Sequence, residues 1–341
     1  MRTDFANLTA AALLAIPGDR PERLFEGSAD DVKRHYRRLA MAWHPDRNRD
    51  PSAPAVFQHI RRLYEMTACR GPLTLAAIDG KTYELDVLRR HPFELGTMYV
   101  ANTVVAFAVD RAHADLVRRA ERMIGNLRYA DDGMRRQIAC HLPPYPFCGA
   151  FQTDSAYVIV MRKRPGDLLL RDVLDHVGGR LDPRHVAWVV SSLLNLCCYF
   201  QYAGITHNAL SPDTCFMSPA GHSVAVLGGW WYAAQTGERM VAAPAGTIAW
   251  AAHDLMDTGR ADIRTDLGLV RAIGRELLGD ITGVRLARDS AAPRAMIDWL
   301  RLPASNDPIE EYRTWRTQVL HDSFGARRFV ELPLTQSDIY R

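Results

Sequence analysis

The 341-residue sequence has no apolar run that reaches the roughly 18 residues needed to cross a bilayer. Its N-terminus also lacks a basic start followed by an uninterrupted apolar core and a cleavage site. Six cysteines, of which only Cys197 and Cys198 are close together, form neither a Cys-x-x-Cys pair nor a disulfide framework. We therefore expect a cytoplasmic protein without a membrane partner, whose cysteines are reduced and mostly buried.

A large excess of charge of one sign is missing as well, because 42 Lys and Arg accompany 39 Asp and Glu. Residues 1–70 hold twelve basic and nine acidic side chains, whereas residues 71–341 hold thirty of each. A nucleic-acid-binding protein usually has a larger basic surplus with aromatic platforms or a reading motif. We expect no nucleic-acid partner, and the scattered His141, His176 and His185 give no metal-ligand spacing, so no metal or cofactor is expected either.

The composition is that of a protein with hydrophobic cores, since 48% of the residues are hydrophobic and 24% are charged. The length exceeds one typical domain, which predicts two domains. The stretch Cys69-Arg70-Gly71-Pro72 is a helix-stopping junction. We place the domains at residues 1–70 and 71–341.

The first domain contains a predicted helical hairpin. Ser28 is a suitable N-cap, and two acids follow it in the first turn. Pro51 to Pro54 close the loop between the two helices. Apolar residues at helical spacing form one stripe on each helix, comprising Val32, Tyr36, Leu39 and Trp43 on the first and Phe57, Ile60 and Tyr64 on the second.

Between the two stripes lies the tripeptide His44-Pro45-Asp46. Proline fixes φ near −65° and has no amide donor, so it ends the preceding helix and starts a stiff turn. The imidazole and the carboxylate at such a tip could be an acid and a base, metal ligands, or charged anchors for a partner protein. The tripeptide alone does not choose among these roles.

The run from Val32 to Ala40, followed by Trp43-His44-Pro45-Asp46-Arg47-Asn48, resembles the J domain of DnaJ-type co-chaperones. The resemblance covers residues 1–70, with residues 8–16 as a short first helix and residues 24–27 as a connection. It implies that the His-Pro-Asp loop and the basic helix dock on a DnaK-type chaperone and stimulate its ATP hydrolysis. The implied partner-binding residues are His44, Pro45, Asp46, Lys33, Arg34, Arg37, Arg38 and Arg47.

The second domain changes from strands to helices along the chain. Alternating apolar and polar residues predict an antiparallel sheet over residues 73–109, with a hairpin turn at Asp79-Gly80. A helix is expected over residues 114–127 and a buried strand over residues 157–161. From residue 182 to the end, the sequence predicts mainly helices.

This order of sheet and helices, together with local matches, resembles a protein kinase over residues 75–300. The resemblance implies a multidomain protein of class α and α+β, with an all-helical J domain followed by a bilobal kinase-like domain. Its sheet lobe covers residues 73–165 and its helical lobe residues 166–341. Asp266 resembles the kinase acid that braces the backbone of the catalytic loop, a structural role.

The residues that kinase chemistry requires are absent from the matching positions. Relative to H-R-D-L-K-P-x-N, His207 is present, but Ala209, Ser211 and Thr214 replace the catalytic Asp, the Lys and the Asn. Ala108 stands at the lysine of V-A-I-K, or Val109 or Asp110 in a register one or two residues later, and none of these is basic. Gly228 lies where D-F-G supplies a magnesium ligand. The loop that covers the phosphates in kinases has the motif G-x-G-x-x-G, and only one of its three glycines, Gly96, is present here.

We therefore expect a non-enzymatic co-chaperone, with a pseudokinase domain that serves client binding or regulation and binds magnesium-nucleotide weakly or not at all. No catalytic residue is expected. The alternative is an atypical kinase-like transferase that uses relocated residues, with Asp110, Asp213 and Glu121 as candidates.

Overall fold

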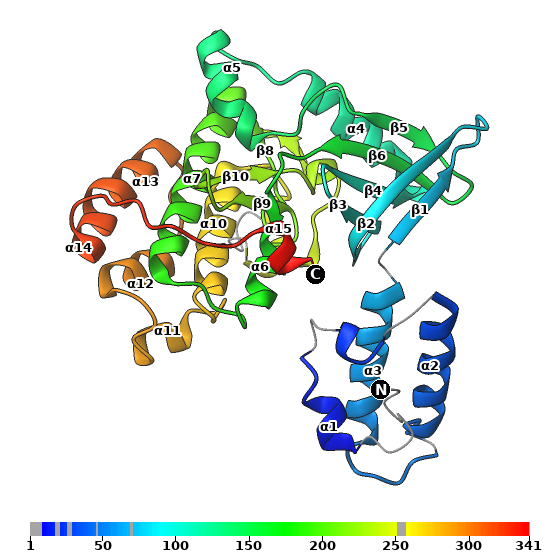
Figure 1. The fold of residues 1–341 in the computed structure, drawn as a ribbon. Coiled ribbons are helices and arrows are strands. Elements are labelled where there is room, and N and C mark those ends of the chain that lie inside the picture. Colours follow the sequence, from blue (N-terminus) through cyan, green and yellow to red (C-terminus); the bar gives the residue numbers. More distant parts are fainter. Residues whose placement is uncertain are drawn as a thin grey trace. The chain divides into compact units, whose positions relative to one another are not determined.

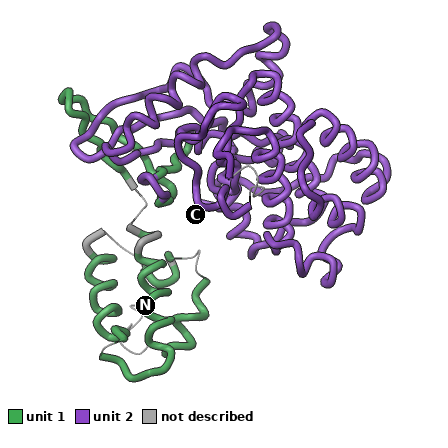
Figure 2. The backbone as a smooth tube through the Cα atoms, turned by 180° about the vertical axis from the view of Figure 1, so that it is seen from behind, with its two compact units in different colours: residues 1–92, 98–102 green, residues 93–97, 103–341 purple. Residues whose placement is uncertain are grey.

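The computed structural model describes residues 9–17, 21–25, 29–45, 47–68, 71–250 and 257–340. The chain divides into two compact units, unit 1 with residues 1–92 and 98–102, and unit 2 with residues 93–97 and 103–341 (Figure 2). Unit 1 thus includes the first strands as well as the N-terminal helices. Our domain boundary between residues 70 and 71 stays a prediction.

The N-terminal part of unit 1 is helical, as the sequence predicts (Figure 1). The predicted first helix is shorter than expected, because it covers five residues that start after the N-cap Thr9. The Thr9 hydroxyl accepts a hydrogen bond from the Ala12 amide, which satisfies one of the free donors at the helix start. The helices are α1 (Ala10–Leu14), the 3-10 helix η2 (Pro21–Arg23), α2 (Ala29–Ala42) and α3 (Ala53–Ala68).

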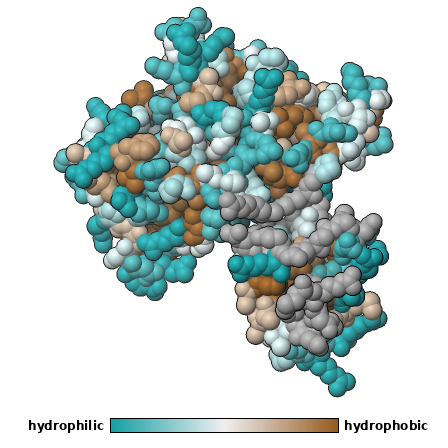
Figure 3. All heavy atoms as spheres, viewed as in Figure 1, coloured by the Kyte–Doolittle hydropathy of each residue, from teal (hydrophilic) through white to brown (hydrophobic). Residues whose placement is uncertain are grey.

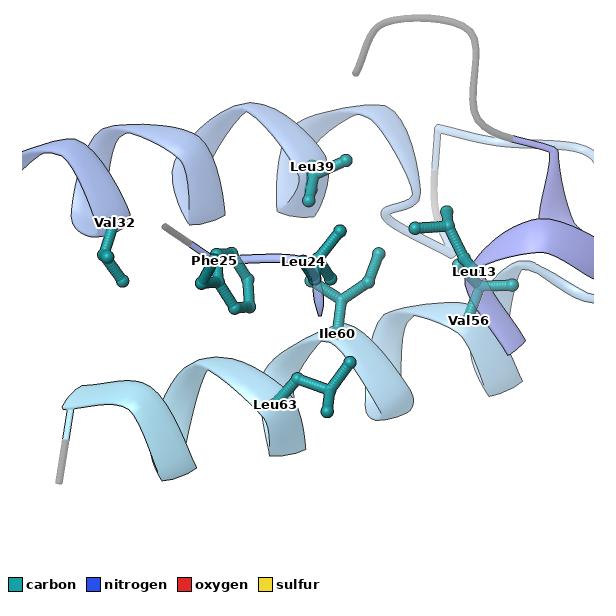
Figure 4. Packing of buried hydrophobic residues seen from close by; sticks show 8 residues of the cluster. All are labelled: Leu13, Leu24, Phe25, Val32, Leu39, Val56, Ile60 and Leu63. Atoms are coloured by element: carbon teal, nitrogen blue, oxygen red, sulfur yellow. The ribbon is translucent and has the colours of Figure 1, made fainter. Parts of the chain in front are cut away.

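The predicted apolar stripes meet between α2 and α3 (Figure 4). Tyr36 on α2 and Tyr64 on α3 stack with ring centroids 3.9 Å apart. The His59 ring bonds to the Ile16 carbonyl oxygen at 2.9 Å, which ties the end of α1 to α3. The buried residues of this core are Leu13, Leu24, Phe25, Val32, Leu39, Val56, Ile60 and Leu63.

The sheet that follows has six strands in the order β1-β2-β3-β4-β6-β5. The predicted hairpin turn is confirmed, because β1 and β2 pair antiparallel with Ala76 opposite Thr82, and Gly80 has a φ of 85°. The predicted helix after the sheet is confirmed as α4 (Ala114–Gly125). The strands are β1 (Gly71–Ala76), β2 (Thr82–Phe93), β3 (Gly96–Ala101), β4 (Val104–Asp110), β5 (Gly149–Gln152) and β6 (Ala156–Arg162).

The rest of unit 2 is mainly helical, but it also holds short strands that the sequence analysis missed. The strands are β7 (Leu168–Leu169), β8 (Ile205–Thr206), β9 (Cys215–Ser218), β10 (Ser223–Val226) and β11 (Ala234–Gln235). The helices are α5 (Asp132–Ile138), α6 (Leu170–His176), α7 (Pro183–Ala203), α8 (Ala245–Trp250), α10 (Ile263–Leu277), α11 (Val284–Arg288), α12 (Arg294–Arg301), α13 (Pro308–Thr314), the π-helix η6 (Trp315–Val319), α14 (Leu320–Phe324) and α15 (Gln336–Ile339), with 3-10 turns η3 (Arg111–His113), η4 (Ala139–His141) and η5 (Trp230–Tyr232).

Helix α7 is the central helix of this part, as its wide apolar face predicts. It is not an uninterrupted apolar run, but its length and mean hydropathy are those of a membrane-spanning helix, and 61% of its most apolar window is buried inside the protein. Its hydrophobicity is therefore explained by its place in the core. On the face shown in Figure 3, hydrophobic residues lie among hydrophilic ones. Among the large hydrophobic residues of the described chain, Val284, Phe329 and Met41 are the most exposed.

The cysteines are less buried than the sequence analysis expected. Of the five in the described part of the chain, all are free thiols, and only Cys197 and Cys215 are buried. Burial raises the pKa of the Cys215 thiol to about 12, so this side chain behaves as a small apolar group.

Candidate functional site

The loop between α2 and α3 is held by its own polar side chains. The Asn48 side chain donates to the Ala42 carbonyl at 2.9 Å and so closes the end of α2. Its oxygen accepts from the Asp50 amide, and the Asp50 carboxylate accepts from the Ser52 amide at 2.8 Å. These successive Asx turns fix the path of the loop. The Asn-x-Asp-x-Ser spacing indicates these turns, which are absent from the predictions above.

His44 is anchored to this loop through its backbone and its ring. Its carbonyl oxygen accepts hydrogen bonds from the amides of Arg47 and Asn48, both at 2.9 Å. Its ring meets Phe57 of α3 edge to face, with centroids 5.3 Å apart. His44 is half-buried and Pro45 is exposed, whereas Asp46 lies outside the described residues. The imidazole is thus held at the tip of the hairpin, where a partner can reach it.

The basic side chains of α2 lie on the face opposite the core. Lys33, Arg34, Arg37 and Arg38 are exposed, as is Arg47 in the loop. Arg34 pairs with Asp31 one turn earlier. Such an exposed pair contributes little to stability, and it leaves the other cations of this face to attract an acidic partner.

His35, on the same helix, has a different environment. It is buried, and its ring lies edge-on to Phe25 with centroids 5.4 Å apart. Burial, and secondarily the Arg38 charge, lowers the pKa of this imidazole. His35 therefore belongs to the core of the hairpin, whereas His44 lies at its tip and is only half-buried.

In unit 2, three of the residues that the sequence analysis compared with kinase motifs lie close together. The two oxygens of the fully buried Asp266 carboxylate accept from the amides of His207 and Asn208, at 2.7 and 2.8 Å. Burial raises the pKa of Asp266 to about 7 and lowers that of His207 to about 3. The His207 ring bonds to the carbonyl oxygen of Gly228 at 3.0 Å. These contacts organise the backbone and leave both side chains without access to solvent.

Ala209, Ser211 and Thr214 lie on the loop that follows His207. The Thr214 hydroxyl donates to the Ala209 carbonyl at 2.9 Å and accepts from the Ser211 amide at 3.0 Å. These are bonds within a turn, since both partners lie three to five residues from Thr214. The loop thus uses its hydroxyl groups to hold its own shape.

Ala108 stands on β4, where its neighbour Phe107 is part of an aromatic cluster with Phe93 and Trp231. Phe93 stacks on Trp231 with centroids 5.2 Å apart, and Phe107 meets Trp231 edge to face at 5.3 Å. A Cβ atom at Gly228 would lie 3.3 Å from the Phe107 ring. The cluster therefore leaves little room at Gly228 for a carboxylate.

Gly96 also has a structural reason to be glycine. A Cβ atom there would lie 2.0 Å from the carbonyl oxygen of Ala108, so the close approach of β3 and β4 admits no side chain. This contact accounts for the one glycine that the sequence shares with a phosphate-covering loop.

The three acids of the alternative hypothesis have separate surroundings, and two of them are bonded to different partners. Asp213 forms a two-point ion pair with Arg171, with both N···O distances 3.0 Å. Glu121 accepts a hydrogen bond from the Tyr157 hydroxyl at 3.2 Å. Asp110 lies at the exposed end of β4. Within the described ranges, no group of three or more His, Cys, Asp or Glu side chains is arranged to hold a metal ion.

Comparison with known proteins identifies one part of the chain. Residues 25–67 match the family model described as DnaJ domain. The chain is 43% identical over 54 residues to Chaperone protein DnaJ 1 of Synechocystis sp., which covers 15% of this chain and 14% of that protein. It is 41% identical over 59 residues to DnaJ homolog subfamily C member 16 of Gallus gallus, covering 16% of this chain and 8% of that protein. A J domain thus lies at residues 25–67, and the chain spans less than a sixth of the length of these relatives.

Proposed function

We propose that this protein is a J-domain co-chaperone that docks on a DnaK-type chaperone and stimulates its ATP hydrolysis. The observation that carries the proposal is the match of residues 25–67 to the DnaJ domain. That segment contains both helices of the hairpin and the loop between them, which are the parts that docking requires.

The surface chemistry of the hairpin supports this function. The exposed cations of α2 lie on one face of that helix and Arg47 is exposed in the loop, while the opposite face of α2 is buried in the core. Attraction between this face and an acidic surface would increase the association rate and orient the encounter. His44 and Pro45 at the tip would then make the specific contacts.

Steady-state ATP hydrolysis by a DnaK-type chaperone tests the proposal. The intact protein should increase the hydrolysis rate, and His44→Gln should remove the increase, because the ring that packs on Phe57 is replaced by a flexible amide. His321→Gln is the matched control, since His321 is an exposed histidine of α14. Equal stimulation by the His44→Gln variant, or none by the intact protein, would refute the proposal.

For residues 71–341 we infer a kinase-like scaffold without phosphoryl transfer. The support is the convergence of His207, Gly228 and Asp266, which come from three separate segments. Phosphoryl transfer depends on positioned charge, namely a lysine, a base and metal-binding acids. The matching positions hold Ala108, Ala209 and Gly228, and the neighbouring space is taken by the aromatic cluster of Phe93, Phe107 and Trp231.

The role that suits such a scaffold is client binding or regulation. Pull-downs from lysate separate this role from chaperone docking. Proteins held by residues 71–341 should be recovered equally with intact protein and with His44→Gln, whereas the chaperone should be recovered only with the intact protein. Loss of both the chaperone and the other bound proteins in the His44→Gln pull-down would contradict separate binding regions for the two.

A further inference from the structure

A polar cavity of about 290 Å³ lies between the start of α4 and the outer strands of the sheet in unit 2. Arg111 and Ala112 of η3, and Ala114, Asp115 and Arg118 of α4, form one wall. Gln152 of β5 and Tyr157 of β6 form the other. Neither the proposed chaperone docking nor the residues compared with kinases use this cavity.

Both arginines are held in place by neutral groups. The Arg111 guanidinium donates to the carbonyl oxygen of Asp154 at 3.3 Å. The Arg118 guanidinium lies 5.8 Å from the centre of the Tyr157 ring, and the hydroxyl of that ring donates to Glu121. Among the described residues, neither arginine forms an ion pair with a carboxylate. Each therefore keeps its charge and most of its donors for another group.

The balance of charge around the cavity is positive. Asp115 is the one acid that lines it, against two arginines. Over residues 111–122, four arginines accompany two acids. The twelve-residue helix α4 begins at this wall, and its dipole adds to the positive potential there.

We propose that this cavity binds a phosphate monoester, with Arg111 and Arg118 as the two guanidinium groups that hold the phosphoryl oxygens. A guanidinium donates in a planar fork that matches phosphate geometry, and two of them can hold one phosphoryl group from two sides. Gln152 supplies a further amide donor on the opposite wall. The Tyr157 ring forms an apolar surface for the group that carries the phosphate.

The size of the cavity limits the ligand. Pockets for drug-sized molecules start at roughly 300 Å³, so this cavity suits a phosphoryl group with a short carrier. Phosphoserine in a peptide and a small phosphorylated metabolite share this chemistry. A peptide carrier would link the site to recognition of phosphorylated clients.

Isothermal titration of the full chain tests the site with inorganic phosphate, with the peptide Ala-Ala-phosphoserine-Ala-Ala and with the same peptide unphosphorylated. The phosphopeptide and phosphate should bind and the unphosphorylated peptide should not. If the phosphopeptide binds more tightly than inorganic phosphate, the ligand is a phosphorylated protein. If the two bind equally, the ligand is a small phosphorylated molecule. Arg111→Gln and Arg118→Gln should each weaken binding by at least about tenfold, because each removes a charge-assisted donor.

Arg122→Gln is the matched control, because Arg122 is exposed on the same helix, one turn beyond Arg118, and does not line the cavity. Binding that is equal in all variants would overturn the proposal, as would a lack of discrimination between the two peptides. Labelling of the unaltered protein with phenylglyoxal gives a readout that does not depend on variant folding. Phosphate should slow the modification of Arg111 and Arg118 relative to Arg122, and an equal rate with and without phosphate would also overturn the proposal.

Discussion

His44 in the hairpin loop and His207 in unit 2 are both histidines in turns, but their surroundings differ. His44 is half-buried at a tip, with one ring face against Phe57 and its backbone tied into the loop. His207 is fully buried, its ring is bonded to Gly228, and its amide is bonded to Asp266. The comparison shows that the same residue type is accessible at a loop tip in one setting and holds the backbone of a buried turn in another.

The two regions also differ in where their polar groups point. In the hairpin, the cations of α2 face solvent, and the core is hydrophobic apart from the buried His35. Around His207, the buried imidazole and the buried Asp266 carboxylate bond to backbone groups of the protein. The first arrangement suits docking and the second suits a scaffold. Changes that affect one region and spare the other will test this distinction.

The largest effect is expected from Leu39→Ala in the core of the hairpin. Leu39 is buried among the residues of the hairpin core, and its removal should lower the free energy of unfolding of this region by about 2–5 kcal/mol. Met41→Ala, two residues further along α2, is the control, because 64% of Met41 is exposed. Hydrogen exchange read separately for the two units measures the effect. A loss of protection in unit 2 as large as that in the hairpin would contradict separate cores.

A smaller effect, with a pH dependence, is expected from Asp266→Asn. Asn keeps one acceptor, so one buried amide loses its partner at a cost of about 1–3 kcal/mol. Because burial raises the pKa of Asp266 to about 7, the folded state holds this proton more tightly than the unfolded state does. The acid therefore adds stability that is fully present below about pH 4 and is lost as the pH rises to about 7.

The cost of Asp266→Asn should consequently be larger at low pH, by up to about 1.4 kcal/mol per pH unit. His207 works in the opposite direction, since its lowered pKa adds stability above about pH 6.5 that is lost on acidification. It is present in both proteins and cancels in the difference. Urea unfolding at two pH values measures this difference, with Asp298→Asn as an exposed control. A cost that does not change with pH would show that Asp266 is not the titrating group.

Gly228→Asp is expected to cost about 1–3 kcal/mol and to restore no nucleotide binding. The new side chain would begin 3.3 Å from the Phe107 ring and from Thr214, so the core must shift to admit it. Gly246→Asp, in open space on α8, should have little effect. Thermal shifts with and without magnesium-ATP measure both quantities. A metal-dependent rise in melting temperature, in the intact protein or in Gly228→Asp, would contradict the pseudokinase proposal.

The smallest effect is expected from Arg37→Gln combined with Arg38→Gln. Loss of two surface cations should slow association with the chaperone by about tenfold at low salt and change the dissociation rate less. Added salt should slow association of the intact protein more than that of the variant. Arg313→Gln with Arg316→Gln is the control on unit 2, and stopped-flow binding is the measurement. An association rate that does not respond to salt would exclude electrostatic steering.

Regular patterns were predictable from the sequence because they reflect local geometry. The stripes of α2 and α3, the turn at Gly80 and helix α4 follow from helical spacing and turn chemistry. The short strands β9 and β10 were not predictable in this way, since a segment with only three consecutive apolar residues does not distinguish a strand from a helix.

The two sites were predictable to different extents, because one is continuous in the sequence and the other is assembled from distant segments. The docking loop is one continuous segment, and its tripeptide stands out in the sequence. Phe57 was assigned to the core, and its contact with His44 depends on how the loop folds back. The Arg111 and Arg118 cavity joins segments about forty residues apart, residues 111–118 with 152–157, which only the sheet brings together.

The central claim is that the ATP chemistry associated with this protein takes place in its partner. Release of labelled phosphate from ATP, measured for the protein alone, for a DnaK-type chaperone alone and for the two together, tests it most directly. We expect no release above background from the protein alone, and release from the mixture that exceeds the sum of the two components. Hydrolysis by the protein alone, or a mixture that equals the sum, would contradict it.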